Sequence, residues 1–128
     1  MLRDEIIASL NSKIRPLDTG AGFETTFIFN KDFTGFQGHF PQHPVLPAFV
    51  QLLVGQCAVG MRNSRNCRLL RIQKAKFLKT IQPGQIVYAR WNELPINNGI
   101  RCDFTLTVEN ERAAAFTIEL AIEEKQNA

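Results

Sequence analysis

His39 is the residue of this sequence whose type and setting most directly suggest chemistry. It lies in the segment Phe36-Gln37-Gly38-His39-Phe40-Pro41-Gln42-His43-Pro44-Val45-Leu46-Pro47, which holds three prolines within seven residues. Each proline fixes φ and lacks an N–H, so the segment is predicted to be a rigid extended loop rather than a helix or a central strand. An imidazole titrates near neutral pH and is therefore able to exchange a proton in catalysis. The alternative is a histidine that only caps a turn by bonding to the backbone.

The run that follows the loop predicts a buried helix. No residue from Ala48 to Met61 is charged. Pro47 suits the first turn of a helix, where a missing N–H costs nothing. We expect a central helix over residues 47–62 that is almost wholly buried. The stiff loop thus leads directly into the N-terminus of this helix, and a polar group is delivered to the edge of an apolar core.

The other elements must position this loop and helix. Apolar residues at helical spacing near the start predict a short amphipathic helix within residues 1–14, from Leu2 to Lys13. Period-two alternation and β-forming residues predict strands over residues 23–29, 69–81, 85–94, 100–108 and 113–123. Short turns are expected at residues 63–67, 82–84, 95–99 and 109–111, which favours an antiparallel meander. The result is a single α+β domain over residues 1–128, an antiparallel sheet wrapped around one buried helix, and it matches the hot-dog fold.

Composition excludes several classes of protein. The 128 residues are 45% hydrophobic and 21% charged, which is ordinary for a globular domain. The uncharged run from Ala48 to Met61 is too short to span a bilayer, and the charged start shows no secretory signal, so we expect no membrane association. Three cysteines without a CxxC pair indicate reduced thiols, and we expect a cytoplasmic protein. His39 and His43 are four residues apart, but Pro41 and Pro44 prevent a shared helical face, so no metal and no cofactor are predicted.

The charges are unevenly distributed. The formal net charge is +3, and all 12 carboxylates lie at or before Asp32 or at or after Glu93. The interval between them contains eight cations: Arg62, Arg65, Arg68, Arg71, Lys74, Lys76, Lys79 and Arg90. One-signed local charge favours an acidic partner. Nucleic acid is not predicted, because aromatic residues are not interleaved with these cations and no binding motif is present.

The loop resembles a known family. The motif Gly38-His39-Phe40-Pro41, followed by Pro44-Val45-Leu46-Pro47, is similar to the signature of the β-hydroxyacyl-acyl-carrier-protein dehydratases, a hot-dog family. The resemblance implies a site between two protomers, in which the motif histidine takes a proton from the α-carbon of a 3-hydroxyacyl thioester. It also implies that a Glu or Asp on the other protomer's central helix handles the departing hydroxyl. A backbone N–H at the helix start would hold the thioester carbonyl, and an apolar tunnel the acyl chain.

Carried over to this chain, the resemblance makes His39 the catalytic base and the Ala48 amide the carbonyl donor. The position of the helix acid falls on Leu53, which has no ionisable group. Gln51 and Gln56 are core amides or orient a water at the vacated position. The predicted substrate-binding residues are Gly38, Phe40, Pro47, Ala48, Gln51, Leu53 and Gln56. The basic residues Arg62, Arg65 and Arg68 are predicted to dock an acidic acyl carrier protein.

Three functions remain open at this point. The leading one is a dehydratase-like protein of fatty-acid or polyketide-type metabolism, acting on thioesters of acyl carrier protein or CoA. The second is a hot-dog thioesterase or isomerase, because this fold hosts several thioester reactions. The third is a non-catalytic acyl-binding subunit that pairs with an active paralogue. The missing acid leaves the choice between a homodimer and a heterodimer with a paralogue open.

Overall fold

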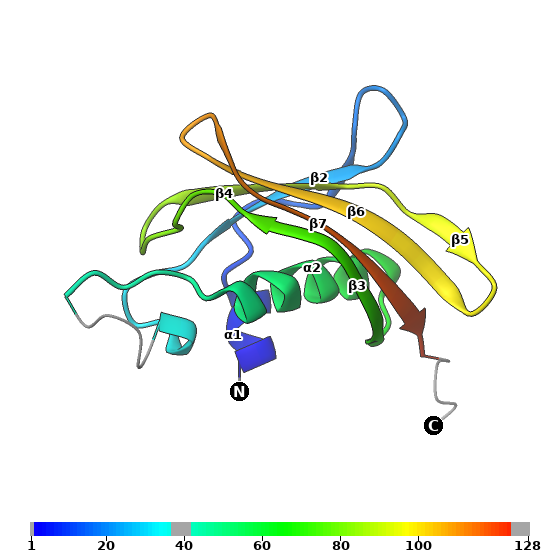
Figure 1. Cartoon of the computed structure of the whole chain (residues 1–128), viewed down its shortest axis with the longest axis horizontal. Coiled ribbons are helices and arrows are strands. Elements are labelled where there is room, and N and C mark those ends of the chain that lie inside the picture. Colours follow the sequence, from blue (N-terminus) through cyan, green and yellow to red (C-terminus); the bar gives the residue numbers. More distant parts are fainter. Residues whose placement is uncertain (1, 37–41, 124–128) are drawn as a thin grey trace.

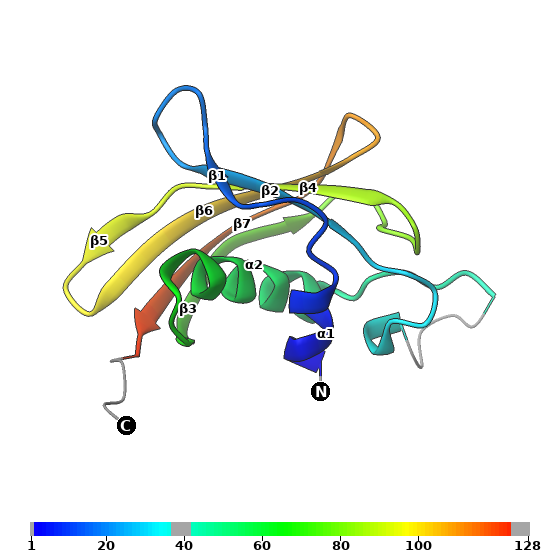
Figure 2. The same ribbon diagram turned by 180° about the vertical axis from the view of Figure 1, so that it is seen from behind.

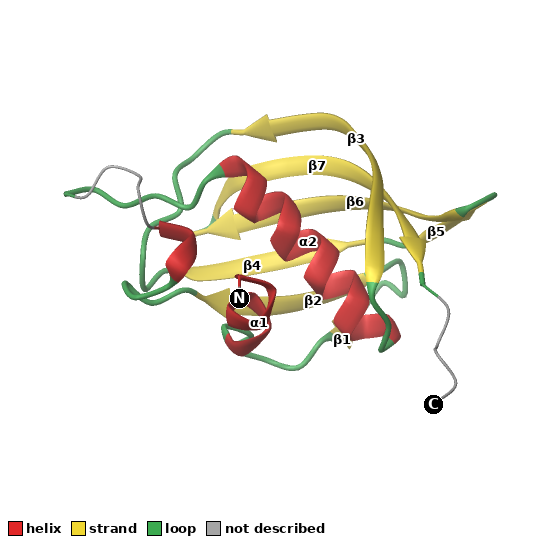
Figure 3. Ribbon diagram, turned by 90° about the horizontal axis from the view of Figure 1, so that it is seen from below, coloured by secondary structure: helices red, strands yellow, loops and turns green. Residues whose placement is uncertain are grey.

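One antiparallel sheet curves around one long helix (Figures 1 and 3). The computed structural model describes residues 2–36 and 42–123. Within those ranges the elements are α1 (Leu2–Ala8), β1 (Arg15–Pro16), β2 (Phe23–Ile28), the 3-10 turn η1 (Thr34–Phe36), α2 (Ala48–Asn63), β3 (Cys67–Phe77), β4 (Ile86–Trp91), β5 (Leu94–Ile96), β6 (Gly99–Val108) and β7 (Glu111–Ile122). The predicted central helix is confirmed, displaced by one residue at each end.

The strand order of the described sheet is β1-β2-β4-β6-β7-β3, and β5 pairs with β6. A simple meander is therefore wrong for one strand, because β3 crosses to the far edge and pairs with β7 instead of β4. The connection from β3 to β4 is held across the end of the sheet, where the Leu46 N–H donates to the Ile81 carbonyl at 2.8 Å. The Gly84 N–H likewise donates to the Phe29 carbonyl at 2.8 Å. Local turn patterns reveal short connections, but they do not reveal which edge a strand joins.

The core lies between the concave face of the sheet and α2. The alternation predicted for β6 is confirmed, since its inward residues are all buried: Cys102, Phe104, Leu106 and Val108. Three stacked rings cross the sheet, with centroids 5.2 Å apart for Trp91 and Phe104 and 5.3 Å apart for Phe104 and Phe116. A Cβ at Gly55 would lie 3.0 Å from the Phe116 ring. Glycine at this position therefore lets α2 sit directly on the aromatic rows.

One side of α2 is not covered by the described chain. Val50 and Val54 are fully buried, whereas the Phe49 side chain is 60% exposed and Leu53 is half-buried. These two lie on a stripe that faces away from the sheet. The expectation of an almost wholly buried helix is thus wrong for this stripe. The uncharged sequence of the helix requires apolar surroundings, but it does not say whether they come from the same chain.

Two other boundaries differ from the prediction. The first helix ends at Ala8 rather than near residue 14, because the chain then turns to run beside β2. There the Asn11 N–H donates to Thr26 O at 2.8 Å and the Ile28 N–H donates to Ser9 O at 3.0 Å. The expected turn over residues 95–99 contains the short strand β5, which pairs Leu94–Ile96 with Gly99–Arg101. In the views of Figures 2 and 3, α1 lies beside α2.

None of the helices in residues 2–36 and 42–123 has the length and apolar character needed to cross a bilayer.

Candidate functional site

The predicted catalytic His39, together with Gly38 and Phe40, lies outside the described residues. The structure does describe the chain on both sides of this segment. It is preceded by η1 and followed by residues 42–47, which lead into α2. The described residues that follow the segment thus lead directly into the N-terminal end of α2.

The segment before His39 is anchored to α1. Oε1 of Glu5 accepts hydrogen bonds from the Thr34 N–H at 3.0 Å and from the Thr34 hydroxyl at 2.7 Å. These bonds lower the pKa of the Glu5 carboxyl, because both stabilise its charged form. Phe33 and Phe36 are buried on either side of Thr34, with ring centroids 5.7 Å apart. Both polar and apolar contacts thus hold the turn that leads into the histidine segment.

The segment after His39 is held by a glutamine of α2. The Gln51 side chain is 3% exposed, and its Nε2 donates to the Leu46 carbonyl at 3.0 Å. Its Oε1 is buried and has no hydrogen-bond partner among the described residues. Gln51 is thus a core amide with one acceptor to spare. It holds the backbone immediately before Pro47.

The start of α2 presents backbone donors. Pro47 is the N-cap, with φ −63° and ψ 154°, and its carbonyl accepts from the N–H groups of Val50 and Gln51 at 3.1 Å each. No acceptor in residues 2–36 or 42–123 is bonded to the N–H of Ala48. The first N–H groups of a helix also lie at the positive end of its dipole. This end of α2 is therefore suited to bind a carbonyl oxygen that gains negative charge.

The position predicted to carry an acid holds a hydrophobic residue on the uncovered stripe. Leu53 is half-buried and packs partly against the core. It shares its side of α2 with Phe49, which is one helical turn away. No residue of α2 bears a carboxyl group. Helix α2 therefore supplies no acid to the N-terminal end of the helix in the same protomer.

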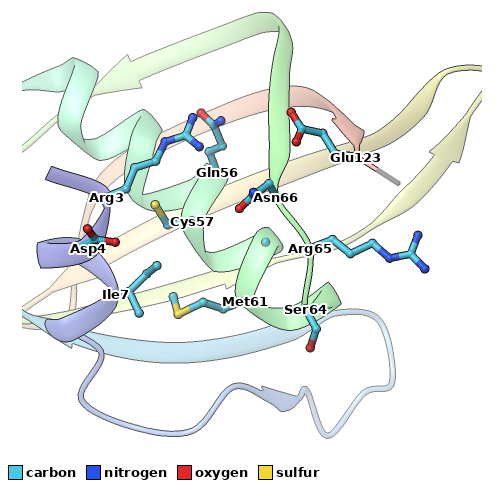
Figure 4. A pocket seen from close by; sticks show the side chains of 11 residues that line it. Arg3, Asp4, Ile7, Gln56, Cys57, Met61, Ser64, Arg65, Asn66 and Glu123 are labelled. Atoms are coloured by element: carbon cyan, nitrogen blue, oxygen red, sulfur yellow. The ribbon is translucent and has the colours of Figure 1, made fainter. Parts of the chain in front are cut away.

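Gln56 lies apart from the helix start. Eight residues separate it from Ala48, which is about 12 Å along the helix axis. Its Nε2 donates to the Cys67 carbonyl at 2.6 Å, and it lines a cavity of about 550 Å³ between α1, α2 and the start of β3 (Figure 4). Cys57 also lines this cavity, and burial raises the pKa of its thiol to about 11, so the sulfur stays protonated near neutral pH. The structure thus separates Gln56 from the predicted substrate-binding residues Pro47, Ala48 and Gln51.

The three arginines predicted to dock a carrier protein point to different places. Arg62 lies over the Phe23 ring, with 4.2 Å from its guanidinium carbon to the ring centroid. Arg65 is among the residues that line the cavity of Figure 4, where its side chain extends away from Gln56 and Cys57, and Arg68 is exposed on β3. They do not form one compact patch on a single protomer. Within the described ranges, no three His, Cys, Asp or Glu residues are placed to hold a metal ion.

Comparison with known proteins identifies the family. The family model of the ApeI dehydratase matches residues 18–118 of the chain, which includes the proline-framed motif, α2 and most of the sheet. The chain belongs to the ApeI-like dehydratase family. The predicted kinship with hydroxyacyl dehydratases is thereby confirmed.

Individual relatives agree with this assignment. The chain is 30% identical over 122 residues to a 3-hydroxyacyl-[acyl-carrier-protein] dehydratase FabZ of Rickettsia africae, an alignment that covers 88% of this chain and 82% of that protein. Among solved structures, the dehydratase heterocomplex ApeI:P from Xenorhabdus doucetiae matches with a TM-score of 0.65 at 20% identity, covering 79% of this chain and 88% of the other. A hypothetical thioesterase with coenzyme A from Streptococcus pneumoniae matches with a TM-score of 0.67 at 9% identity, covering 98% and 97%. These likenesses confirm the hot-dog fold.

Sequence reasoning missed the anchor between Glu5 and Thr34. The two residues are 29 positions apart, and nothing in their local spacing connects a helix near the N-terminus with a turn before His39. Gln51 was singled out as a substrate-binding residue and as a possible core amide, but its partner Leu46 was not predicted. Its bond to Leu46 depends on how the loop folds back on the first turn of α2, which spacing along the chain does not encode.

Proposed function

We propose that this member of the ApeI-like dehydratases acts on 3-hydroxyacyl thioesters of acyl carrier protein or CoA, with His39 as the base. The observation that carries the proposal is that the proline-framed histidine segment leads directly into the N-terminus of α2, where the backbone N–H of Ala48 is available to a ligand. Gln51 and the Leu46–Ile81 bond hold one end of that segment, and Glu5 holds the other. The family assignment supports the same reaction class.

The reaction follows from the chemistry of these groups. The Ala48 N–H donates to the thioester carbonyl and stabilises the negative charge that develops on its oxygen. The imidazole of His39 takes the proton from the α-carbon, and the electron pair of that C–H bond forms the new double bond to the β-carbon. The C–O bond at the β-carbon then breaks, and the hydroxyl leaves as water after receiving a proton. Leu53 has no proton to give for this last step.

The missing acid is proposed to come from a second chain. Leu53 lies on the uncovered stripe of α2, the side on which another protomer would meet the helix. A paralogue with Glu or Asp at the position of Leu53 would supply the acid to His39 of this chain. The dehydratase heterocomplex to which the fold is similar supports such a pairing. In this arrangement the heterodimer has one complete site, whereas a homodimer of this chain has none.

The test is an assay for 2-enoyl thioester formation from 3-hydroxyacyl-CoA and from the acyl-carrier-protein thioester. We expect the chain alone to be inactive or nearly so, and the variant Leu53→Glu to dehydrate the substrate as a homodimer. The control is Leu53→Gln, which has similar size and polarity but no ionisable proton. The double variant His39→Ala/Leu53→Glu should lose the activity. Activity that persists without His39, or a folded Leu53→Glu homodimer with no activity, would contradict the proposal.

The same samples test the thioesterase alternative. A thiol reagent reports CoA release from acyl-CoA, and the fold is shared with a thioesterase. Release that depends on His39, with no enoyl product, would favour hydrolysis over dehydration.

The docking of an acyl carrier protein stays a proposal for Arg65 and Arg68, which are exposed. It predicts that reversing their charges raises KM for the carrier-bound substrate and leaves KM for the CoA thioester unchanged.

A further inference from the structure

Another cavity lies at the end of the sheet opposite to the start of α2. It has a volume of about 790 Å³ and is lined by the β1–β2 hairpin, the last turn of α2 and the segment between β4 and β6. Figures 2 and 3 show β1 and β5 toward one end of the sheet and η1 at the other. Arg62 in its lining is fourteen residues beyond Ala48, which is about 21 Å along the helix axis. The cavity is therefore separate from the proposed catalytic end of α2.

The walls of this cavity include closely packed backbone. Within the hairpin, the Leu17 N–H donates to the Gly22 carbonyl at 2.8 Å. A Cβ at Gly22 would collide with the carbonyl oxygen of Trp91, and a Cβ at Gly99 would collide with that of Leu120. Glycine is needed where two backbones approach so closely. Main-chain packing thus contributes to the shape of the cavity, in addition to the side chains that line it.

Apolar side chains form much of the cavity lining. They come from the hairpin and from the strands beside it: Pro16, Phe23, Leu94, Pro95 and Ile100. Leu94 is 50% exposed, whereas Phe23 and Ile100 are half-buried. The Phe23 ring packs against Trp91, with ring centroids 6.0 Å apart. The cavity can therefore hold a small apolar group.

Arg62 supplies the cavity with a cation. Its guanidinium carbon lies 4.2 Å from the centroid of the Phe23 ring. No carboxylate in residues 2–36 and 42–123 lies within 4 Å of this guanidinium. Stacking on a ring uses the face of a guanidinium, whereas its N–H groups point outward in the plane and can hold a carboxylate through two parallel bonds. Arg62 is thus suited to bind the carboxylate of a ligand.

Glu93 supplies the opposite charge. Its Oε2 accepts from Trp91 Nε1 at 3.0 Å, and its Oε1 accepts from Asn63 Nδ2 at 3.4 Å. Both donors are neutral, and the described part of the chain places no cation within 4 Å of this half-buried carboxylate. The two donors hold the carboxylate in place without balancing its charge, and each oxygen can accept a further hydrogen bond. An ammonium group at this point would supply both the bond and the charge.

We propose that this cavity binds a free α-amino acid with an apolar side chain. The α-carboxylate accepts hydrogen bonds from Arg62, and the α-ammonium group donates to Glu93. The apolar side chain packs against Leu94 and Ile100. Arg62 and Glu93 do not pair with each other within 4 Å, so a ligand that carries both charges bridges them, whereas a ligand with one charge satisfies only one of them. The proposal does not depend on the dehydratase reaction.

The test compares leucine with two analogues that each lack one charge. Isocaproate lacks the ammonium group, and isoamylamine lacks the carboxylate. Trp91 is the only tryptophan of the chain and donates to Glu93, so its indole N–H resonance in a nitrogen-15 NMR titration reports on the site. We expect leucine to bind at least about tenfold more tightly than either analogue, because each loses a charge-assisted contact. An analogue that binds as tightly as leucine, or no change of the indole resonance with leucine, would overturn the proposal.

Two variants test the two charged contacts separately. Arg62→Gln should reduce the affinity for leucine to that for isoamylamine and leave the affinity for isoamylamine unchanged. Glu93→Gln should reduce the affinity for leucine to that for isocaproate. The matched controls Arg112→Gln and Glu123→Gln replace exposed residues that do not line this cavity, and both should bind leucine as the wild type does. If Glu93→Gln fails to fold, Arg62→Gln still decides: unchanged leucine affinity, or a loss equal to that in Arg112→Gln, would contradict the proposal.

Discussion

One carboxylate oxygen joins the N-terminal helix to the turn before the histidine segment. Oε1 of Glu5 accepts both the backbone N–H and the hydroxyl of Thr34. Charge-assisted hydrogen bonds of this kind are stronger than those between neutral groups. Thr34 is the first residue of η1, so this contact fixes the turn that precedes the histidine segment. A residue far from the helix start thus has a part in placing the site.

The variant Glu5→Gln tests that contact through its pH dependence. The lowered pKa means that Glu5 stabilises the folded state above the pKa that it has in the unfolded chain. This contribution is lost as pH falls through the lower, folded-state pKa. We therefore expect urea unfolding to show the wild type more stable than Glu5→Gln at pH 7 and equal to it in strong acid. The control Asp4→Asn, on the same helix but without a bond to Thr34, should change stability little at either pH.

The pKa of its thiol explains why Cys57 is not expected to act as a nucleophile. Burial raises its thiol pKa to about 11, and burial likewise raises the pKa of Cys67 and Cys102. A protonated thiol is a poor nucleophile. The three cysteines therefore act as small apolar side chains of the core, which is the interpretation that the apolar sequence around Cys57 favours.

At the scale of elements, the position of α2 depends on the side chains of the sheet below it. Gly55 sits above Phe104 and Phe116, and the other buried residues of α2, apart from two glutamines, are small or β-branched. The helix start must stay in place relative to the loop for Ala48 to meet a substrate. Packing beneath the middle of the helix therefore contributes to the geometry at its end.

The variant Gly55→Ala should reduce the free energy of unfolding by about 1–3 kcal/mol. Its Cβ would lie 3.0 Å from the Phe116 ring and 3.3 Å from the Phe104 ring, so the helix or the rings must move. The higher helix propensity of alanine offsets only part of this cost. Chemical denaturation measures the change. Combining the variant with Phe116→Leu should recover part of the loss, and additive losses in the double variant would show that the two side chains do not collide.

For the whole molecule, the main feature is a set of exposed apolar side chains on α2, on β3 and just after β3. Phe49 of α2 and Leu78, the residue after β3, are 60% and 59% exposed. Leu69, Ile72 and Phe77 lie on the concave side of β3. Isolated exposed hydrophobic residues are ordinary, but a series beside a free strand edge is not. The surface lies along the same side of α2 as Leu53. The second chain proposed to supply the acid would therefore meet the side of α2 that carries both Phe49 and Leu53.

The variant Phe49→Ser should separate assembly from folding. An exposed side chain contributes little to the stability of the protomer, so we expect the free energy of unfolding to change by less than about 0.5 kcal/mol. Homodimer formation by the Leu53→Glu variant, followed by sedimentation velocity, should weaken clearly when Phe49→Ser is added. Val50→Ser is the contrast, since Val50 is fully buried and its loss should cost about 2–4 kcal/mol. If Phe49→Ser unfolds as readily as Val50→Ser, the surface belongs to the protomer core and not to an interface.

The sequence by itself determined the features that depend on neighbours along the chain. The prolines around His39, the uncharged run that becomes α2 and the alternation of β6 each impose a local geometry, because φ restriction and side-chain periodicity act over a few residues. Tertiary structure alone decided that β3 joins β7 at the far edge, that Glu5 reaches Thr34, and that Phe49 stays exposed. Each of these depends on which surfaces meet when residues far apart in the sequence come together. The spacing of residues along the chain does not say which surfaces those will be.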